Sequence, residues 1–328
     1  MLTVYMKTPQ GLRKSDMDAL AGNSTCAVWV DLYQPNQEEE RQVEVLLGLD
    51  IPTREELQEI ELSSRLFVEG HAQFMTASLM CKADTDRPQT SPVTFVLTGN
   101  ALVTVRYDAP RPFVTFPAQA ERHQEIGNSS LDVLSALLDA IVDRTADVLE
   151  RLEREVDALS TEIFASRAAT KADRAGAIYK EALQKIGRNQ MVALKIGESL
   201  VSIGRLVAFL SRPREDNGKL PKGTSQRLKT LQRDISSLTD HTGHLANTIT
   251  FMLDAVLGLM QSEENTVIKI FSIMAVVFLP PTLVGTIYGM NFKHMPELDA
   301  NWGYPLALLV MVLSALLPVL YFRRKGWF

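Results

Sequence analysis

Two uncharged apolar runs near the end of the chain constrain its fold more than any other feature. The runs cover residues 270–288 and 303–322, and each is 19 or 20 residues long. A hydrocarbon core of about 30 Å is spanned by roughly 20 helical residues. The sequence therefore predicts two membrane-spanning helices. The alternative is a buried hairpin of a soluble protein, but uncharged runs of this length are uncommon in soluble cores.

The residues around these runs predict how the chain crosses the membrane. Arg323, Arg324 and Lys325 follow the second run directly, and the positive-inside rule assigns such a cluster to the cytoplasm. The first 20 residues contain no sustained apolar segment of the kind found in a signal peptide. We therefore expect a multi-pass protein of the cell inner membrane, with both termini cytoplasmic and the connector 289–302 on the outside.

Charge and cysteine usage exclude several classes of protein. Of the 34 basic and 39 acidic residues, only five and four lie beyond residue 260, so the preceding part is mildly acidic. Such a charge gives no reason to expect a nucleic-acid partner. Cys26 and Cys81 show no CxxC or metal-ligand spacing, and we interpret them as reduced thiols.

Residues 1–117 are predicted to form a cytoplasmic α/β domain. Runs rich in β-branched and aromatic residues indicate strands at 2–8, 27–33, 65–80 and 93–108. Helical spacing is present at 37–48 and 53–60, where Thr53 is placed as an N-cap with Glu56 three residues on. The dipeptide Gly99-Asn100 is a hairpin-turn signal. The prolines within residues 106–116 are interpreted as a break between elements.

The segment 118–225 is predicted to contain two long antiparallel helices, at roughly 129–168 and 172–211. A loop is expected over 211–225, because Pro213, Gly218, Pro221 and Gly223 interrupt the pattern there.

A regular apolar seam follows this loop and defines a stalk helix over 226–268. Its members step by three and four residues, and only Thr242 among them is polar: Leu228, Leu231, Ile235, Leu238, Thr242, Leu245, Ile249, Met252, Val256 and Leu259. The sequence contains no stop signal before the first span, 269–288, so one continuous helix is expected. The seam requires partners, either in the same chain or in neighbouring copies.

The first span carries a stripe of polar and small residues on one face. The stripe consists of Ser272, Ala275, Thr282 and Thr286, with Leu279 among them, and it continues below the span through Ile268 and Asn265. Polar side chains within a span usually face protein or water rather than lipid, so the stripe indicates either a water-filled passage or helix packing. The second span, 303–322, has a single hydroxyl, Ser314. Two helices cannot enclose a passage, so any passage needs several copies around an axis.

The connector resembles that of a known family. The motif Gly289-Met290-Asn291 follows Tyr288 and precedes Phe292, the run 295–298 and Gly303-Tyr304-Pro305. This arrangement is similar to the CorA family of magnesium and cobalt transporters. The resemblance implies a funnel-shaped homopentamer, in which first spans line a pore and second spans surround them. The α/β domains would form the cytoplasmic mouth, and residues 323–328 a basic cytoplasmic tail.

The resemblance also implies roles for individual residues. Gly289, Met290 and Asn291 would form the selectivity filter, with Asn291 as an outer ring. The pore below would be lined by Asn265, Ile268, Phe271, Ser272, Leu279 and Thr286. Carboxamide oxygens suit a hydrated Mg²⁺ ion, which gives up its water reluctantly and must also be released. Glu297 and Asp299 would raise the local cation concentration, or would simply be solvated loop charges.

Regulation is expected at the cytoplasmic side. Family members close when cytoplasmic divalent ions bridge acidic residues, and Asp234 and Asp240 are the candidates here. Their alternative role is that of solvated charges on a stalk. Lys269 with Arg323, Arg324 and Lys325 would form a basic cluster near the cytoplasmic exit. Mg²⁺ is thus expected as substrate and regulatory ligand, without a catalytic cofactor.

The expected function is uptake of Mg²⁺, and also of Co²⁺ or Ni²⁺, down the membrane potential. A zinc or other metal transporter of the same superfamily is one alternative, and a non-conducting coiled-coil scaffold is another. An enzyme is not expected, because the five histidines form no catalytic constellation and no phosphate-binding GxxxxGK[ST] loop occurs. The expected partners are other copies of the chain, membrane lipid and divalent cations.

Overall fold

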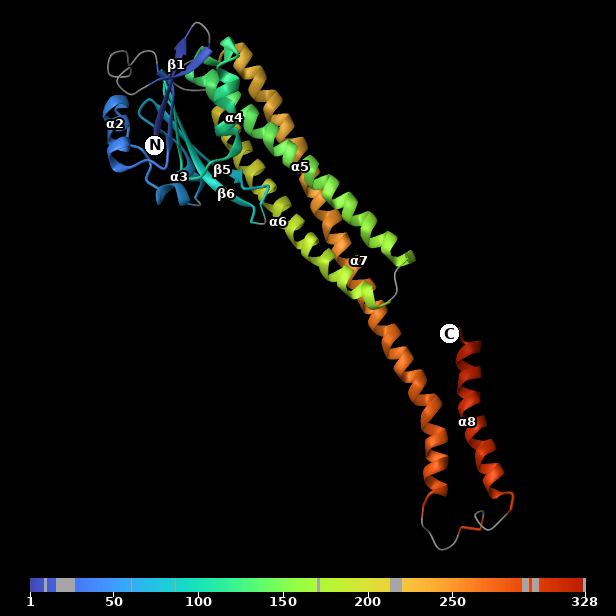
Figure 1. The fold of residues 1–328 in the computed structure, drawn as a ribbon. Helices are drawn as coiled ribbons and strands as arrows, with labels where there is room; N and C mark the ends of the chain where they lie inside the picture. The colour runs from blue at the N-terminus through green and yellow to red at the C-terminus, as the bar shows by residue number, and fades with distance from the viewer. Residues whose placement is uncertain are drawn as a thin grey trace. The chain divides into compact units, whose positions relative to one another are not determined.

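The computed structural model describes residues 1–8, 11–15, 27–59, 61–85, 87–169, 172–212, 220–290, 295–296 and 301–326. These residues divide into two units (Figure 1). The first unit contains residues 1–169 and 180–253, and the second contains 170–179 and 254–328.

The first unit is built on a seven-stranded sheet with the order β2-β1-β3-β7-β6-β5-β4. All neighbouring strands are antiparallel except β3 and β7, which are parallel. The strands are β1 (Leu2–Thr8), β2 (Gly11–Ser15), β3 (Ala27–Tyr33), β4 (Leu66–Glu69), β5 (Ala72–Cys81), β6 (Gln89–Leu97) and β7 (Leu102–Arg106).

Helices make up most of the remainder of the described chain. They are α2 (Gln37–Leu47), the 3-10 turn η1 (Glu56–Gln58), α3 (Leu62–Arg65), α4 (Arg111–Ala120), the 3-10 turn η2 (Gln124–Gly127), α5 (Ser130–Ala169), α6 (Ala172–Leu210), α7 (Lys222–Tyr288) and α8 (Gly303–Arg324). The N-terminal α/β domain and two C-terminal candidate spans are therefore as predicted, and α7 is the expected continuous helix.

Three sequence predictions about local structure were wrong. The proline-containing segment that was interpreted as a break forms helix α4, because Pro112 lies in the first turn, where a missing N–H does no harm. The segment from Thr53 keeps its capping contacts, with the Thr53 N–H donating to Glu56 Oε2 at 2.8 Å, but it forms only the turn η1. The expected loop is shorter, because α7 begins directly after Pro221.

The strands were located well, with two differences. The run at 65–80 is a hairpin of β4 and β5 that turns at Gly70, whose φ of 56° is accessible mainly to glycine. Strand β2 was not predicted, since Gly-Leu-Arg-Lys-Ser has no period-two pattern.

Both faces of the sheet are covered within the first unit. One face packs on α2 through a cluster that includes Val30, Leu32 and Val43. On the other face, Trp29 stacks on Tyr5 and makes an edge contact with Phe116 of α4, with ring centroids 4.4 and 5.6 Å apart. Burial on both sides explains why β5 and β7 consist mostly of apolar or small residues, with Gln73 in β5 and Arg106 in β7 as the long polar exceptions.

A buried ion pair joins the parallel strands β3 and β7. Asp31 and Arg106 are 5% and 7% exposed, and the guanidinium donates to both carboxylate oxygens, at 3.0 and 2.8 Å. Thr104 donates a further hydrogen bond to Asp31 Oδ1 at 2.8 Å. The guanidinium also lies over the rings of Tyr33 and Phe113. This carboxylate is therefore fully satisfied although it is buried.

Helix α6 completes the outer edge of β5. Strand β6 pairs with one edge of β5 as far as Cys81, but on the other edge β4 pairs only with Ala72 to Met75. The N–H groups on that edge beyond Met75 therefore have no strand partner. The Ser78 N–H donates to Ser202 Oγ at 2.9 Å, and the Met80 N–H donates to Ser199 Oγ at 3.2 Å. The adjacent Cys81 is buried, and burial raises the pKa of its thiol to about 12, which fits an unreactive reduced cysteine.

The apolar seam of α7 finds its partners within the same chain over the first unit. Its members from Leu228 to Met252 are buried, except for Leu238, which is half-buried. Thr242 satisfies its hydroxyl by donating to the Leu238 carbonyl at 2.7 Å. Gly204 of α6 lies against Ile235, where an added Cβ would be 3.3 Å from Ile235 Cγ2. The sequence left open whether the seam packs against the same chain or against neighbouring copies. In the first unit, the seam is buried against helices of the same chain.

Three arginines converge on Asp84, in the connection between β5 and β6. Arg144 Nη2 lies 3.0 Å from Asp84 Oδ2, Arg111 Nη1 lies at 3.5 Å, and Arg151 makes the shortest contact. The hydrogen bond from Arg151 is the main cause that lowers the pKa of the Asp84 carboxyl. The connection is thereby attached to α5.

Replacing Asp84 by asparagine is expected to lower the free energy of unfolding by about 1 kcal/mol at pH 7, the upper end for exposed pairs. A carboxyl whose pKa is lower in the folded state stabilises the fold above its unfolded pKa of about 3.9. That contribution is lost as the pH falls through the lowered folded value. Thermal unfolding of both proteins should therefore converge at acidic pH. Asp147→Asn is the control, since the Asp147 carboxylate lies 4.0 Å from Arg144 and its loss should change the stability little. A difference in stability between the wild type and Asp84→Asn that stays constant at all pH values would contradict this explanation.

Candidate functional site

Most residues of the apolar part of α7 and of α8 are exposed or only partly buried in the single chain. Both helices are long and apolar enough to cross a membrane. In the most apolar 18 residues of each helix, only 6% of the residues of α7 and none of those of α8 are buried. Exposed side chains of this kind require lipid or further copies of the chain around them.

The polar stripe of α7 lies on a face that α8 does not cover. Ile268 and Leu279 are 61% and 65% exposed, and Asn265, Ser272 and Thr286 are also exposed. Ile273, on another side of the helix, is only 7% exposed. The predicted pore-lining residues are thus brought together on one open face. Phe271, which was predicted with them, is exposed near the edge of that face.

Two threonines of the stripe present acceptor oxygens. Thr282 donates its hydroxyl proton to the Phe278 carbonyl at 2.7 Å. The Thr286 hydroxyl lies 2.8 and 2.9 Å from the carbonyls of Thr282 and Leu283. Because these protons are directed to the backbone, the remaining lone pairs can accept hydrogen bonds from the waters of a hydrated cation. The sequence pattern indicated the stripe but not this orientation.

The predicted filter begins where α7 ends. The Gly289 N–H donates to the Gly285 carbonyl at 3.0 Å, and the Met290 N–H donates to the Ile287 carbonyl at 3.2 Å. A Cβ at residue 289 would be 3.2 Å from the Gly285 oxygen, so glycine suits this close approach. Asn291, Glu297 and Asp299 lie outside the described residues.

Gly285 is a contact residue that the sequence did not single out. An added Cβ would lie 2.9 Å from Met311 Cε of α8, which is the flexible end of a side chain. Small residues allow membrane helices to approach closely, so Gly285 fixes the spacing of α7 and α8 in the second unit.

We expect Gly285→Leu to destabilise the second unit by about 1–3 kcal/mol, because the larger side chain overpacks the α7–α8 contact. Thermal unfolding of the full-length protein measures the effect. Combining it with Met311→Ala should recover part of the loss. Gly258→Leu is the matched control, since nothing lies within 4 Å of its Cβ position, and a comparable loss there would contradict the steric explanation.

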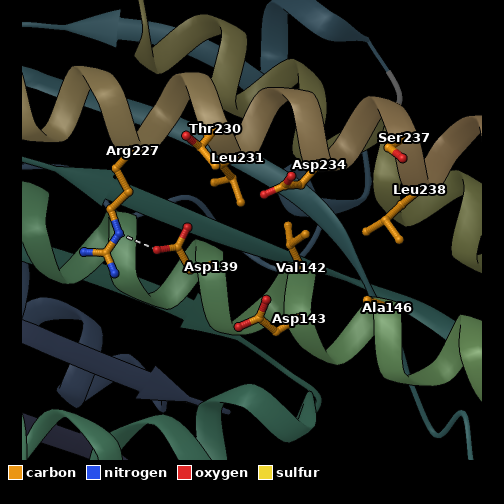
Figure 2. Close-up of a pocket in the computed structure, with 10 residues that line it drawn as sticks. All are labelled: Asp139, Val142, Asp143, Ala146, Arg227, Thr230, Leu231, Asp234, Ser237 and Leu238. Carbon is orange, nitrogen blue, oxygen red and sulfur yellow. Dashed lines mark hydrogen bonds and ion pairs between the residues drawn. The ribbon is translucent and has the colours of Figure 1, made fainter.

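The acidic residue Asp234 lines a groove between α5 and α7 in the first unit (Figure 2). The groove has a volume of about 590 Å³ and also contains Asp139 and Asp143. Figure 2 shows Arg227 extended toward Asp139, and its guanidinium Nε is in short contact with Asp139 Oδ2. One cation therefore faces three carboxylates.

Electrostatics in this groove favour added positive charge. Burial is the main cause that raises the pKa of Asp139; Arg227 opposes it, and Asp143 reinforces it. The pKa of Asp143 is also raised, first by burial and then by Asp147 and Asp234. The raised pKa values mean that the charged form of these two carboxyls is disfavoured, chiefly by burial, and a cation bound in the groove would favour it.

Asp240, the other regulatory candidate, is not part of this groove. It is exposed one turn and a half further along α7. Its neighbour His241 contacts Glu153 of α5 at 3.5 Å. Within the described ranges, no group of three or more His, Cys, Asp or Glu side chains has an arrangement that could hold a metal ion.

The basic cluster is divided between the two helices. Arg323 and Arg324 form the last turn of α8, and the Lys325 ammonium lies 5.4 Å from the Tyr321 ring centroid. Lys269 lies on α7, where it lines a groove that faces α8.

The fold and this site define a protein with two candidate membrane spans, a polar stripe along one of them and a large α/β and helical part outside the spans. Residues 25–324 match the family described as "CorA-like Mg2+ transporter protein", and the chain belongs to this family.

Relatives and solved structures agree with this assignment. The chain is 33% identical to the magnesium transport protein CorA of Pectobacterium atrosepticum over 327 residues, which is 100% of each chain. It is also 33% identical to the protein of that name from Escherichia coli over 301 residues, or 92% of each chain. The solved CorA magnesium transporter of Methanocaldococcus jannaschii has the same fold, with a TM-score of 0.78 and 20% identity over 100% of this chain and 99% of that one.

Proposed function

We propose that several copies of this chain form a channel-like passage that admits Mg²⁺ to the cell. The observation that carries the proposal is the stripe on α7, whose polar and apolar residues share one exposed face that α8 leaves open. Membership of the CorA-like family supports magnesium as the main cargo. The proposed assembly is a homopentamer in the inner membrane, with both termini cytoplasmic, as Arg323, Arg324 and Lys325 favour.

Selection is proposed at the outer end of α7. A ring of Asn291 carboxamide oxygens would accept hydrogen bonds from the waters of a hydrated cation without removing those waters. Neutral oxygens would hold the ion weakly enough for release. Gly289 and Met290 would set the chain direction, and Glu297 and Asp299 would add negative potential at the entrance.

Conduction and closure are proposed along the stripe. Ser272 and Thr286 would offer hydroxyl oxygens, whereas rings of Ile268 and Leu279 would close the passage by excluding water. Entry is driven by the membrane potential, about 4.6 kcal/mol for a divalent ion at 100 mV. Asn265 and Phe271 would line the cytoplasmic end of the passage.

Regulation by cytoplasmic Mg²⁺ is proposed at Asp234 rather than at Asp240. Asp234 shares a groove with Asp139 and Asp143, so three carboxylates lie together with Arg227, and a bound divalent cation would offset the burial that raises the pKa of Asp139 and of Asp143. A ligand from a neighbouring copy would be needed, since one chain alone supplies no metal-ligand group among the described residues. Asp240 stays a second candidate because it is exposed on the same helix.

Transport by reconstituted protein tests the proposal. Purified full-length protein is placed in liposomes, a negative-inside potential is imposed, and Mg²⁺ entry is followed with an internal dye. We expect entry that depends on the potential, with Co²⁺ and Ni²⁺ competing. Entry of Zn²⁺ in preference to Mg²⁺ would support the zinc alternative instead, and no entry of any ion would leave the scaffold as the better account.

A further inference from the structure

A groove between α7 and α8 in the second unit has a lining unlike that of the proposed passage. Its volume is about 400 Å³, within the range of about 300–1,000 Å³ that is typical of ligand pockets. The lining is mostly apolar and includes Ile270, Ile273, Val277, Phe278 and Val319. Figure 1 shows α8 running beside the C-terminal part of α7, which is where the groove lies.

The groove lies on the side of α7 away from the stripe. At 3.6 residues per turn, Ile270 and Val277 are about 140–180° around the helix from Ser272 and Leu279. If the stripe faces a passage at the centre of several copies, the groove faces outward to the bilayer. The inference rests on the proposed function in this respect.

Cationic side chains lie at the cytoplasmic end of this groove. Lys269 is part of its lining. Arg323 follows Val319 by four residues on α8 and so lies on the same face of that helix, one turn closer to the cytoplasm. Among the described residues that line the groove there is no aspartate or glutamate. An apolar groove that ends in two cations is complementary to a molecule with an apolar chain and an anionic head.

We propose that this groove binds one anionic phospholipid of the cytoplasmic leaflet. An acyl chain lies along α7 from Ile270 to Phe278, a length of about 12 Å, and against Val319 of α8. The lipid phosphate lies between Lys269 and Arg323. The Thr266 hydroxyl donates to the Ser262 carbonyl at 3.0 Å, so its oxygen can accept a hydrogen bond from the lipid headgroup.

The headgroup, rather than the chain, decides which lipid binds. When an acyl chain moves from the bilayer into the groove, it passes from one apolar environment to another. The hydrophobic effect therefore contributes little to the free energy of binding. Attraction between anionic lipid and basic residues at the membrane surface discriminates between headgroups. A zwitterionic lipid with the same chains should therefore bind more weakly.

Native mass spectrometry of the full-length protein tests this site. The protein is incubated with phosphatidylglycerol or with phosphatidylcholine of the same acyl chains, and the retained lipid is counted. We expect preferential retention of phosphatidylglycerol, and a loss of about fivefold in affinity for each of Lys269→Gln and Arg323→Gln. Lys325→Gln removes an equal charge beyond the end of α8 and should change retention much less.

A second pair of variants separates the groove from the surface charge. Val319→Trp should fill the groove and displace the lipid while every cation stays in place; Val277→Phe does the same from α7 if the first variant does not fold. Equal retention of the two lipids would overturn the proposal, as would an equal loss in Lys325→Gln. Wild-type protein that retains no lipid would also overturn it.

Mg²⁺ entry measured on the same preparations keeps the two proposals distinguishable. Retained phosphatidylglycerol in a protein that conducts no cation would contradict the proposed function alone. Cation entry in a protein that retains phosphatidylglycerol and phosphatidylcholine equally would contradict the lipid site alone.

Discussion

Asn291→Ala is expected to lower Mg²⁺ entry into liposomes by about 10- to 100-fold, the factor that corresponds to the loss of hydrogen bonds of about 1.5–3 kcal/mol to a charged group. The alanine side chain offers no oxygen that could accept hydrogen bonds from the waters of the hydrated ion, so the bonds that these waters made to bulk solvent would not be replaced at the ring. Entry is measured at a fixed negative-inside potential, with the protein content of the liposomes matched.

Two further variants sharpen this result. Asn247→Ala removes an exposed carboxamide from the first-unit part of α7 and should leave Mg²⁺ entry unchanged. Asn291→Asp places carboxylates at the proposed ring and should slow release, because bound Mg²⁺ would be held too tightly. Equal entry through the wild type and Asn291→Ala would show that residue 291 does not select the ion.

Arg106→Met is expected to lower the free energy of unfolding of the first unit by about 3–5 kcal/mol. The methionine fills much of the same space but leaves the Asp31 carboxylate buried, with Thr104 as its one remaining side-chain donor among the described residues. The midpoint of thermal unfolding should fall on the order of 10 °C. Circular dichroism or intrinsic fluorescence of the purified protein would record the shift.

The matching double variant tests the cause of that loss. Asp31→Leu combined with Arg106→Met removes both charges and should recover most of the stability, since well-packed apolar residues replace buried ion pairs at little cost. Arg233→Met, on the exposed side of α7, should be nearly neutral. A double variant as unstable as Arg106→Met alone would mean that the guanidinium acts mainly through its contacts with the Tyr33 and Phe113 rings.

Long periodic elements were predictable because their residues carry the same signal over many turns. The seam from Leu228 to Leu259 predicted helix α7, and the absence of a stop signal predicted its continuation to Tyr288. The strand at 27–33 was also located correctly, since its β-branched and aromatic residues fit a buried strand.

Short elements depended on tertiary contacts that one sequence does not reveal. Helix α4 forms in a proline-rich segment because Phe113 and Phe116 are buried under the sheet. Strand β2 exists because it pairs with β1, although its own residues lack a strand pattern. In both segments packing outweighs local propensity.

The candidate site shows the same division. The stripe from Asn265 to Thr286 follows from helical periodicity within one element, and the sequence was sufficient to find it. The groove that joins Asp234 to Asp139 and Asp143 requires α5 and α7 to pack side by side, and no spacing along the chain reveals that pairing. The contact between Gly285 and Met311 likewise depends on how α8 returns along α7.

The central claim is that the stripe of α7 faces water in the assembled protein. Single cysteines can be placed on it at Ser272 and Leu279, and on the groove side at Ile273 and Val277, after the native Cys26 and Cys81 are replaced.

Reaction of each single-cysteine protein with a small charged thiol reagent, with Mg²⁺ entry recorded before and after, is the most direct measurement. The account predicts that the cysteines at 272 and 279 react and that the reaction blocks entry, whereas those at 273 and 277 stay unmodified. Equal reactivity on both sides of α7, or modification at 272 and 279 without loss of entry, would contradict it.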